Sequence, residues 1–135
     1  IDRPGSAQSV IVAGHVLDAK GTDDLTALRA ANSVLGGDFL SRLNFDLRET
    51  KGWAYGVASG ISGNEQQVAF TFSAPVQADR TGDTIRAFKT NLTEFLGARG
   101  VTAAELERTI NGNVRELPGS FETSSDVLGG VAAII

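Results

Sequence analysis

The sequence predicts an α+β domain with a largely antiparallel sheet. β-branched and alternating apolar residues indicate strands at 9–17 and 53–74, while apolar residues at helical spacing indicate helices around them. The helical segments are 22–35, 38–47, 81–99 and 102–117, with a last helix starting near Ser124. No repeat, low-complexity tract or linker divides the 135 residues, so we expect residues 1–135 to form a single domain.

The first strand carries three consecutive β-branched residues, Val10, Ile11 and Val12. A strand with one solvated face alternates apolar and polar residues, whereas an unbroken apolar run is typical of a strand covered on both faces. We therefore expect both faces of 9–17 to be buried.

Two helical pieces should follow this strand. Cap residues and acids at 22–24 begin the first, whose stripe is Leu25, Leu28, Ala31 and Leu35. Gly36-Gly37 predicts its end, because glycine adopts the left-handed conformation common at helix C-termini. The second piece, 38–47, has apolar residues four apart at Phe39, Leu43 and Leu47.

The next segment alternates with the period of a strand. Large residues fall on one face and small ones on the other: Trp53, Tyr55, Val57 and Ile61 against Ala54, Gly56, Ala58 and Gly60. Turn residues at 62–64 and renewed alternation at Val68, Phe70 and Phe72 predict an antiparallel hairpin. The face of small residues would allow a helix or another backbone to approach closely.

The second half is predicted to be helical. Ile85, Phe88, Leu92 and Phe95 form one stripe that Gly100 should end, and Thr102 and Glu105 form a capping box for the helix that runs to Pro118.

Composition argues against some classes of function and excludes certain kinds of site. A net charge of −4 argues against nucleic-acid binding, and zero cysteines exclude disulfides and thiolate metal sites. No apolar run approaches the ~20 residues of a membrane span. The chain starts at Ile1, lacks methionine and ends on an apolar run at 131–135, so we expect a truncated domain, a fragment of a longer chain.

The sequence offers few residues that could bind a catalytic metal or act as a nucleophile. A catalytic zinc needs about three protein ligands, and the single histidine, His15, cannot supply an HExxH or HxxEH site, nor is there a nucleophile elbow for a triad. We expect His15 to be a surface or hydrogen-bonded core residue. Gly36-Gly37 lacks the preceding strand and the lysine of a phosphate-binding loop, so a helix terminator is the favoured interpretation.

The densest polar cluster spans 42–56. There a helix carrying Arg48 should pass through a glycine turn into a strand carrying Tyr55. A guanidinium offers a planar fork of donors and a phenol offers a neutral one, so together they could hold a peptide carbonyl or an oxyanion. The alternative from spacing alone is that Arg48 pairs with Glu49 or Asp46 and that Tyr55 packs beside Trp53.

Several linked motifs resemble one family. They are Arg3-Pro4-Gly5-Ser6, the stretch Leu35-Gly36-Gly37-Asp38-Phe39-Leu40-Ser41-Arg42-Leu43, and Leu47-Arg48-Glu49-Thr50-Lys51-Gly52-Trp53-Ala54-Tyr55-Gly56, with Ala74-Pro75-Val76-Gln77 behind them. Together they resemble the C-terminal, non-catalytic domain of the insulinase/pitrilysin zinc peptidases, especially the bacterial relatives of mitochondrial processing peptidase. Arg42 and Gly36-Gly37 match family positions that we interpret as structural.

The resemblance implies a division of labour. It implies an α+β domain with helices on one face of the sheet, facing a catalytic domain or subunit that carries HxxEH, a distant glutamate and the zinc. The zinc would activate water, and a glutamate of that partner would take the proton. This chain would bind no metal and would be inactive alone. Its Arg48 and Tyr55 would contact the substrate carbonyl and the oxyanion of an extended peptide. The resemblance is to bacterial proteins, and it leaves both the periplasm and the cytoplasm as possible locations.

Two other hypotheses remain. One is a catalytically silent structural or docking subunit of the same fold, which retention of both Arg48 and Tyr55 disfavours. The other is a small-ligand binding module that uses the Gly36-Gly37 turn. A dimer formed through surfaces that a longer chain would cover also stays open.

Overall fold

The structure, a computed structural model, describes residues 5–132. The strands are β1 (Gln8–Leu17), β2 (Ala58–Gly63) and β3 (Val68–Gln77). The α-helices are α1 (Thr26–Asn32), α2 (Arg42–Asn44), α3 (Thr81–Leu96), α4 (Ala103–Glu116) and α5 (Ser124–Ala132). The π-helical turns η1 (Ser33–Gly37) and η2 (Phe45–Thr50) extend α1 and α2, and the 3₁₀ turns η3 (Ala78–Arg80) and η4 (Gly119–Phe121) lie further on.

The sheet has the strand order β1-β3-β2, with both neighbours antiparallel to the central β3. Phe72 of β3 lies opposite Ala13 on one side and Ser59 on the other. The predicted α+β class, the antiparallel sheet and the hairpin of β2 and β3 are confirmed. The sheet is small, which agrees with a truncated domain.

The predicted alternation over 53–57 is wrong. Regular strand begins at Ala58, and before it Ala54 makes one isolated bridge to Val76. Val57 is buried, whereas Tyr55 is 91% exposed, so these two side chains do not share a face. The N–H groups of Trp53 and Ala54 donate to the carbonyl of Leu47 in η2. The backbone of Val57 is hydrogen-bonded to the side chain of Asn44 in α2, so the strand period does not apply.

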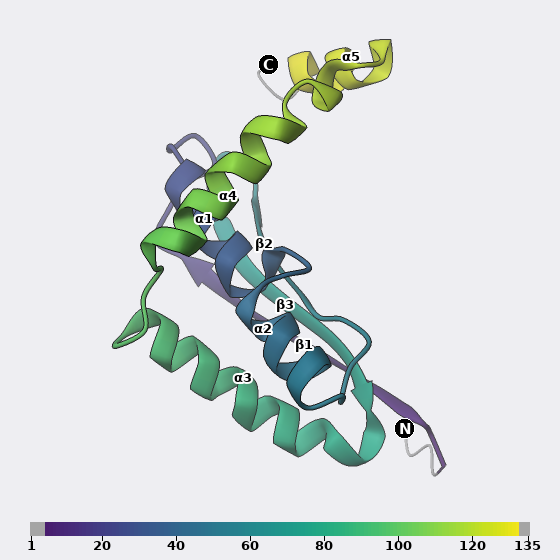
Figure 1. Ribbon diagram of the computed structural model, residues 1–135. Helices are drawn as coiled ribbons and strands as arrows, with labels where there is room; N and C mark the ends of the chain where they lie inside the picture. The colour runs from purple at the N-terminus through teal and green to yellow at the C-terminus, as the bar shows by residue number, and fades with distance from the viewer. Residues whose placement is uncertain (1–4, 133–135) are drawn as a thin grey trace.

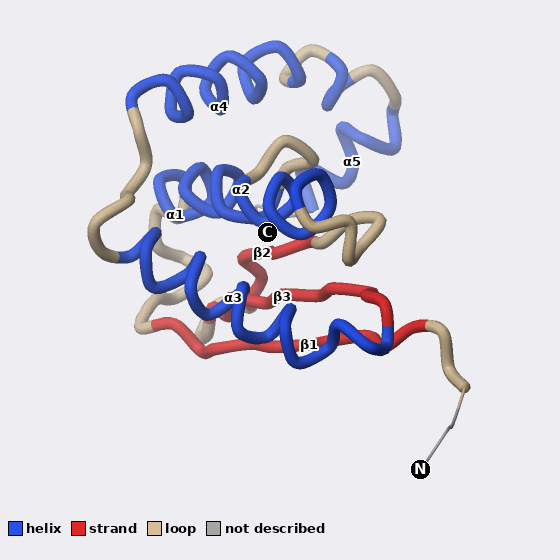
Figure 2. The backbone as a smooth tube through the Cα atoms, turned by 60° about the horizontal axis from the view of Figure 1, so that its bottom comes forward, coloured by secondary structure: helices blue, strands red, loops and turns tan. Residues whose placement is uncertain are grey.

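The helices cover one face of the sheet, as expected. Figure 2 shows α1 and α2 one after the other in a row above the strands, with α4 farther out. Phe72 stacks on Phe88 of α3, with ring centroids 4.1 Å apart and planes 17° apart. Residues of η1, α2, η2 and β3 complete the same core, namely Leu35, Leu43, Leu47, Ala74 and Val76. Figure 1 shows α4 crossing α1 and leading to α5 beyond the sheet.

The other face of the sheet is bare in the described part of the chain. Val10 is 67% exposed and Val12 74% exposed, while Ile11 between them packs against the core. The expectation that both faces of this strand are buried is therefore wrong. β-branched residues favour extended backbone for steric reasons of their own, so they predict a strand better than they predict its cover.

The helical segment ends at Gly37 as predicted, but not through a left-handed glycine. Within residues 5–132 positive φ occurs only at Gly5 and Gly52, so neither glycine is left-handed. A Cβ at Gly36 would instead lie 2.6 Å from Ser59 Oγ and 2.8 Å from Leu43 Cδ1. Glycine is required there because a strand and a helix approach its backbone closely.

The later helices follow the prediction closely. Thr102 and Glu105 form the expected capping box, and α5 begins at Ser124. α3 ends at Leu96, before the predicted Arg99, with Gly97 at its C-terminal cap. In the described part of the chain, no helix combines the length and apolar character needed to cross a membrane.

Candidate functional site

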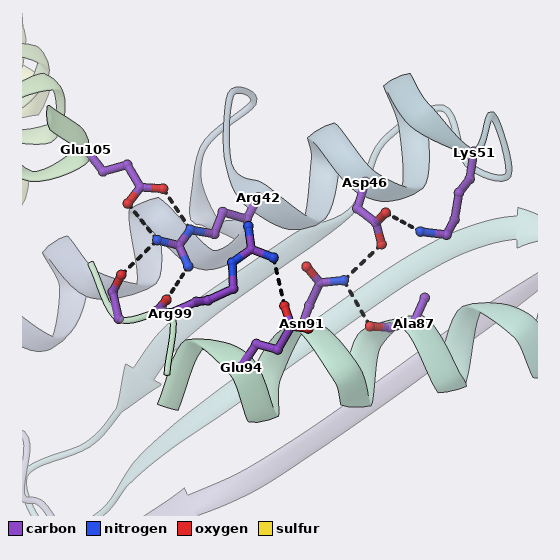
Figure 3. Close-up of polar contacts among 9 residues, drawn as sticks. Arg42, Asp46, Lys51, Ala87, Asn91, Glu94, Arg99 and Glu105 are labelled. Atoms are coloured by element: carbon purple, nitrogen blue, oxygen red, sulfur yellow. Dashed lines mark hydrogen bonds and ion pairs between the residues drawn. The ribbon is translucent and has the colours of Figure 1, made fainter. Parts of the chain in front are cut away.

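Arg42 is anchored to the start of α4 (Figure 3). Its Nε and Nη2 donate to the two carboxylate oxygens of Glu105, each at 2.7 Å. It also donates to the carbonyls of Arg99 and Gly100, the latter at 2.9 Å, and lies over the ring of Phe95 at 5.3 Å. The guanidinium and the capping bonds from Thr102 lower the pKa of Glu105 from 4.5 to about 2. These contacts agree with a structural role for Arg42.

Asp46 ties the same helical segment to α3 (Figure 3). It pairs with Lys51 and accepts a hydrogen bond of 2.9 Å from Asn91, which itself donates to the carbonyl of Ala87. Asp46 is thus occupied by partners other than Arg48.

Arg48 lies near the end of η2. Its Nη2 is 2.9 Å from Oε1 of Glu49, and its Cζ lies 3.7 Å from the centroid of the Phe39 ring. The side chain keeps 25% of its surface exposed. The ion pair with Glu49 is the one that the alternative hypothesis anticipated, whereas the ring contact is new.

Tyr55 follows through a tight turn. Gly52 has φ 64°, and the carbonyl of Leu47 accepts hydrogen bonds from the backbone N–H groups of Trp53 (2.9 Å) and Ala54 (3.4 Å). Arg48 follows Leu47 in the chain and Tyr55 follows Ala54. The backbones of the two candidate residues therefore lie next to the hydrogen bond between Ala54 and Leu47. The helix and the glycine turn agree with the sequence-based expectation, whereas Tyr55 precedes the strand, which begins at Ala58.

A residue that sequence analysis missed holds this region together. Asn44 is 3% exposed, and its Oδ1 accepts from Val57 N (2.9 Å) while its Nδ2 donates to Val57 O (2.8 Å). Nδ2 also lies 3.1 Å from the carbonyl of Asp38 and 3.2 Å from Ser41 Oγ. One amide therefore connects the segment before Phe39, helix α2 and the segment after Tyr55. The sequence signal was weak: asparagine is a poor helix former within a helical stretch.

The described side chains do not fit a catalytic zinc. Within residues 5–132 no three His, Cys, Asp or Glu side chains cluster as metal ligands. His15 is exposed on β1, beside an apolar pocket of about 190 Å³ between α1, α3 and the sheet. Gly36 is buried against Ser59 and Leu43, which leaves no cradle for a phosphate at this turn.

Comparison with solved structures supports the fold. The structure resembles a peptidase M16 inactive domain from Pseudomonas fluorescens (28% identity, TM-score 0.80), covering 96% of this chain and 31% of that one. It also resembles the inactive peptidase domain of a proposed zinc protease from Bordetella parapertussis (26% identity, TM-score 0.70), covering 98% of this chain and 70% of that one. A protease from Helicobacter pylori shares the fold at 24% identity and TM-score 0.80, with 94% of this chain and 31% of that chain covered.

The chain thus spans about a third of the length of two of these relatives. Among curated proteins no significant match is found. The family model described as the peptidase M16 inactive domain matches residues 1–113. The chain therefore belongs to the peptidase M16 inactive-domain family, as the resemblance to insulinase/pitrilysin peptidases implied.

Proposed function

We propose that this chain is the substrate-binding, non-zinc half of a metalloendopeptidase. In this proposal Arg48 and Tyr55 contact the scissile peptide, while an HxxEH-containing domain or subunit holds the zinc. The chain's membership of an inactive-domain family supports the division of labour.

The exposure of Tyr55 carries the proposal. Tyr55 is the only tyrosine of the chain and is 91% exposed, although an aromatic ring of this size gains stability from burial. The backbone is held on both sides of Tyr55. Ala54 donates a hydrogen bond to the carbonyl of Leu47, and the backbone N–H and C=O of Val57 both bond to the side-chain amide of Asn44. Tyr55 follows Ala54 and Arg48 follows Leu47, so the hydrogen bond between Ala54 and Leu47 brings the two backbones close. A hydrogen-bonded backbone that exposes a phenol in this way suits ligand contact better than packing.

The two side chains would have different tasks. A tyrosine hydroxyl donates one hydrogen bond without carrying charge, which suits an oxyanion that develops in the transition state. Arg48 has five N–H donors, and its partner Glu49 engages Nη2, so further donors remain for a substrate carbonyl. Because Glu49 balances the charge of Arg48, the pair suits a neutral carbonyl within an extended peptide.

The direct test is Tyr55→Phe in the complete peptidase, with the HxxEH-containing domain present. Removing one oxyanion donor lowers kcat by ~10²–10³-fold. KM should change little, because the ring remains and the lost bond is strongest in the transition state. Arg48→Ala should lower kcat/KM as well, and Arg29→Ala, an exposed arginine on α1, is the control.

The alternative is a structural or docking subunit without a part in chemistry. The Arg48–Glu49 ion pair agrees with this alternative, because a surface arginine forms such pairs without any functional role. Wild-type kcat in Tyr55→Phe together with wild-type kcat/KM in Arg48→Ala would exclude the substrate-binding proposal and leave this alternative.

A further inference from the structure

We propose that Phe39 is a positioning residue for Arg48: its ring and the carboxylate of Glu49 hold the guanidinium in the direction that a substrate carbonyl requires. The inference rests on the proposed function of Arg48 and adds how the arginine is aimed. Phe39 itself does not touch the reacting atoms in this account.

The ring contact is close. Three cation–ring pairs occur among residues 5–132, and the Arg48 Cζ lies 3.7 Å from the Phe39 centroid. The pairs Arg42–Phe95 and Lys51–Trp53 are wider, at 5.3 and 5.5 Å. Attraction of a guanidinium to a ring face acts within ~6 Å and grows as the pair loses water. Phe39 is therefore well placed to restrain Arg48.

Phe39 has no evident packing role that would explain it otherwise. It is 61% exposed and stands outside the core cluster of the fold. An exposed aromatic with one close cationic neighbour contributes little to stability by burial. Its substitution should therefore leave the core intact and affect mainly what it contacts.

The backbone beside Phe39 is fixed, so the ring can serve as a support. Asp38 donates its N–H to Ser33 O at 3.3 Å, and its carbonyl accepts from Ser41 N at 3.0 Å and from Asn44 Nδ2 at 3.1 Å. Asn44 also holds Val57, two residues after Tyr55. The supports for Arg48 and Tyr55 thus share one buried amide.

The geometry leaves Arg48 able to bind. A ring under the guanidinium engages its face and uses none of its N–H donors, because these lie in the guanidinium plane. Glu49 engages Nη2. Free arginine side chains populate many rotamers, so a support on one face and a carboxylate at one edge reduce the ordering that substrate binding would otherwise require.

The test is a double-mutant cycle on kcat/KM of the complete peptidase. Phe39→Leu should lower kcat/KM by about 2- to 5-fold, the range of one exposed cation–ring contact. Phe39→Trp, which keeps an aromatic face, should restore wild-type activity. In the Arg48→Ala background Phe39→Leu should have no further effect, because the group it positions is gone.

Phe45→Leu is the matched control. Phe45 is a similarly exposed phenylalanine of η2, at 66%, and it enters none of the cation–ring contacts within residues 5–132. It should leave kcat/KM unchanged in both backgrounds, and thermal melts of all variants should coincide with wild type.

The outcomes separate the two proposals. Loss of activity in Arg48→Ala with none in Phe39→Leu would overturn the positioning role and leave the proposed function standing. Equal losses from Phe39→Leu with and without Arg48, or a Phe39→Trp variant as impaired as Phe39→Leu, would also overturn it. Wild-type activity of Arg48→Ala would overturn both together.

Discussion

The Arg42–Glu105 pair should make the fold sensitive to acid. The pair connects α2 to the start of α4. Glu105 is also the N3 residue of the α4 capping box. Glu105→Gln is a conservative change, because glutamine also serves in a capping box and keeps the shape of the side chain. The substitution therefore removes mainly the negative charge.

The magnitude follows from the pKa of Glu105. A carboxyl whose pKa falls from 4.5 in the unfolded chain to about 2 in the folded one stabilises the fold by at most about 3 kcal/mol at pH 7. Between these values the unfolded state binds more protons, so this contribution decreases as the pH falls. It is fully present above the unfolded pKa, and by pH 3 roughly 2 kcal/mol of it is lost.

The assay is urea denaturation of wild type and Glu105→Gln at pH 7, 5, 4 and 3, followed by circular dichroism. Taking the difference between the two proteins cancels the titration of the other carboxyls. Glu107→Gln is the control, since Glu107 is exposed on the same helix and enters no ion pair within residues 5–132. A wild-type-minus-variant difference that is equal at pH 7 and pH 3 would refute the reasoning, because an ionised pair must weaken as Glu105 is protonated.

Three further changes test the fold by their free energy of unfolding in urea. Asn44→Ala should cost about 2–4 kcal/mol, because it leaves the buried N–H and C=O of Val57 without their partner; a loss below 1 kcal/mol would show that the amide is dispensable. Gly36→Ala should cost about 1–3 kcal/mol through overlap with Leu43 and Ser59, whereas Gly119→Ala, with open space around it, is its control. Val12→Thr on the bare sheet face should change stability by less than about 0.5 kcal/mol, and a larger loss would mean that this face is covered in solution.

Features with a local cause were predicted from the sequence. The capping box of Thr102 and Glu105 and the turn between β2 and β3 depend on residues only a few positions apart. The helix–glycine–Tyr55 connection also belongs here, because the left-handed Gly52 and the bonds to Leu47 O are consequences of helix termination. Spacing could therefore place Arg48 and Tyr55 near each other.

Features with a distant cause were not predicted. The requirement for glycine at 36 comes from Ser59, a residue of another element, and not from the helix end itself. Burial of Asn44 and exposure of Val12 likewise depend on which elements reach them. Sequence patterns report backbone preference and amphipathicity, whereas these properties are set by tertiary contact.

The two arginines of the α2–η2 segment show why side-chain contacts decide the candidate site. In sequence both are arginines within one polar cluster. Arg42 donates to both oxygens of Glu105 and to two backbone carbonyls, so its fork is committed within the fold. Arg48 has an exposed carboxylate at one edge and a ring on one face, which restrain it without using most of its donors. Of these two arginines, Arg48 keeps more of its donors free within the described residues, and it is therefore the one that we propose contacts a peptide carbonyl.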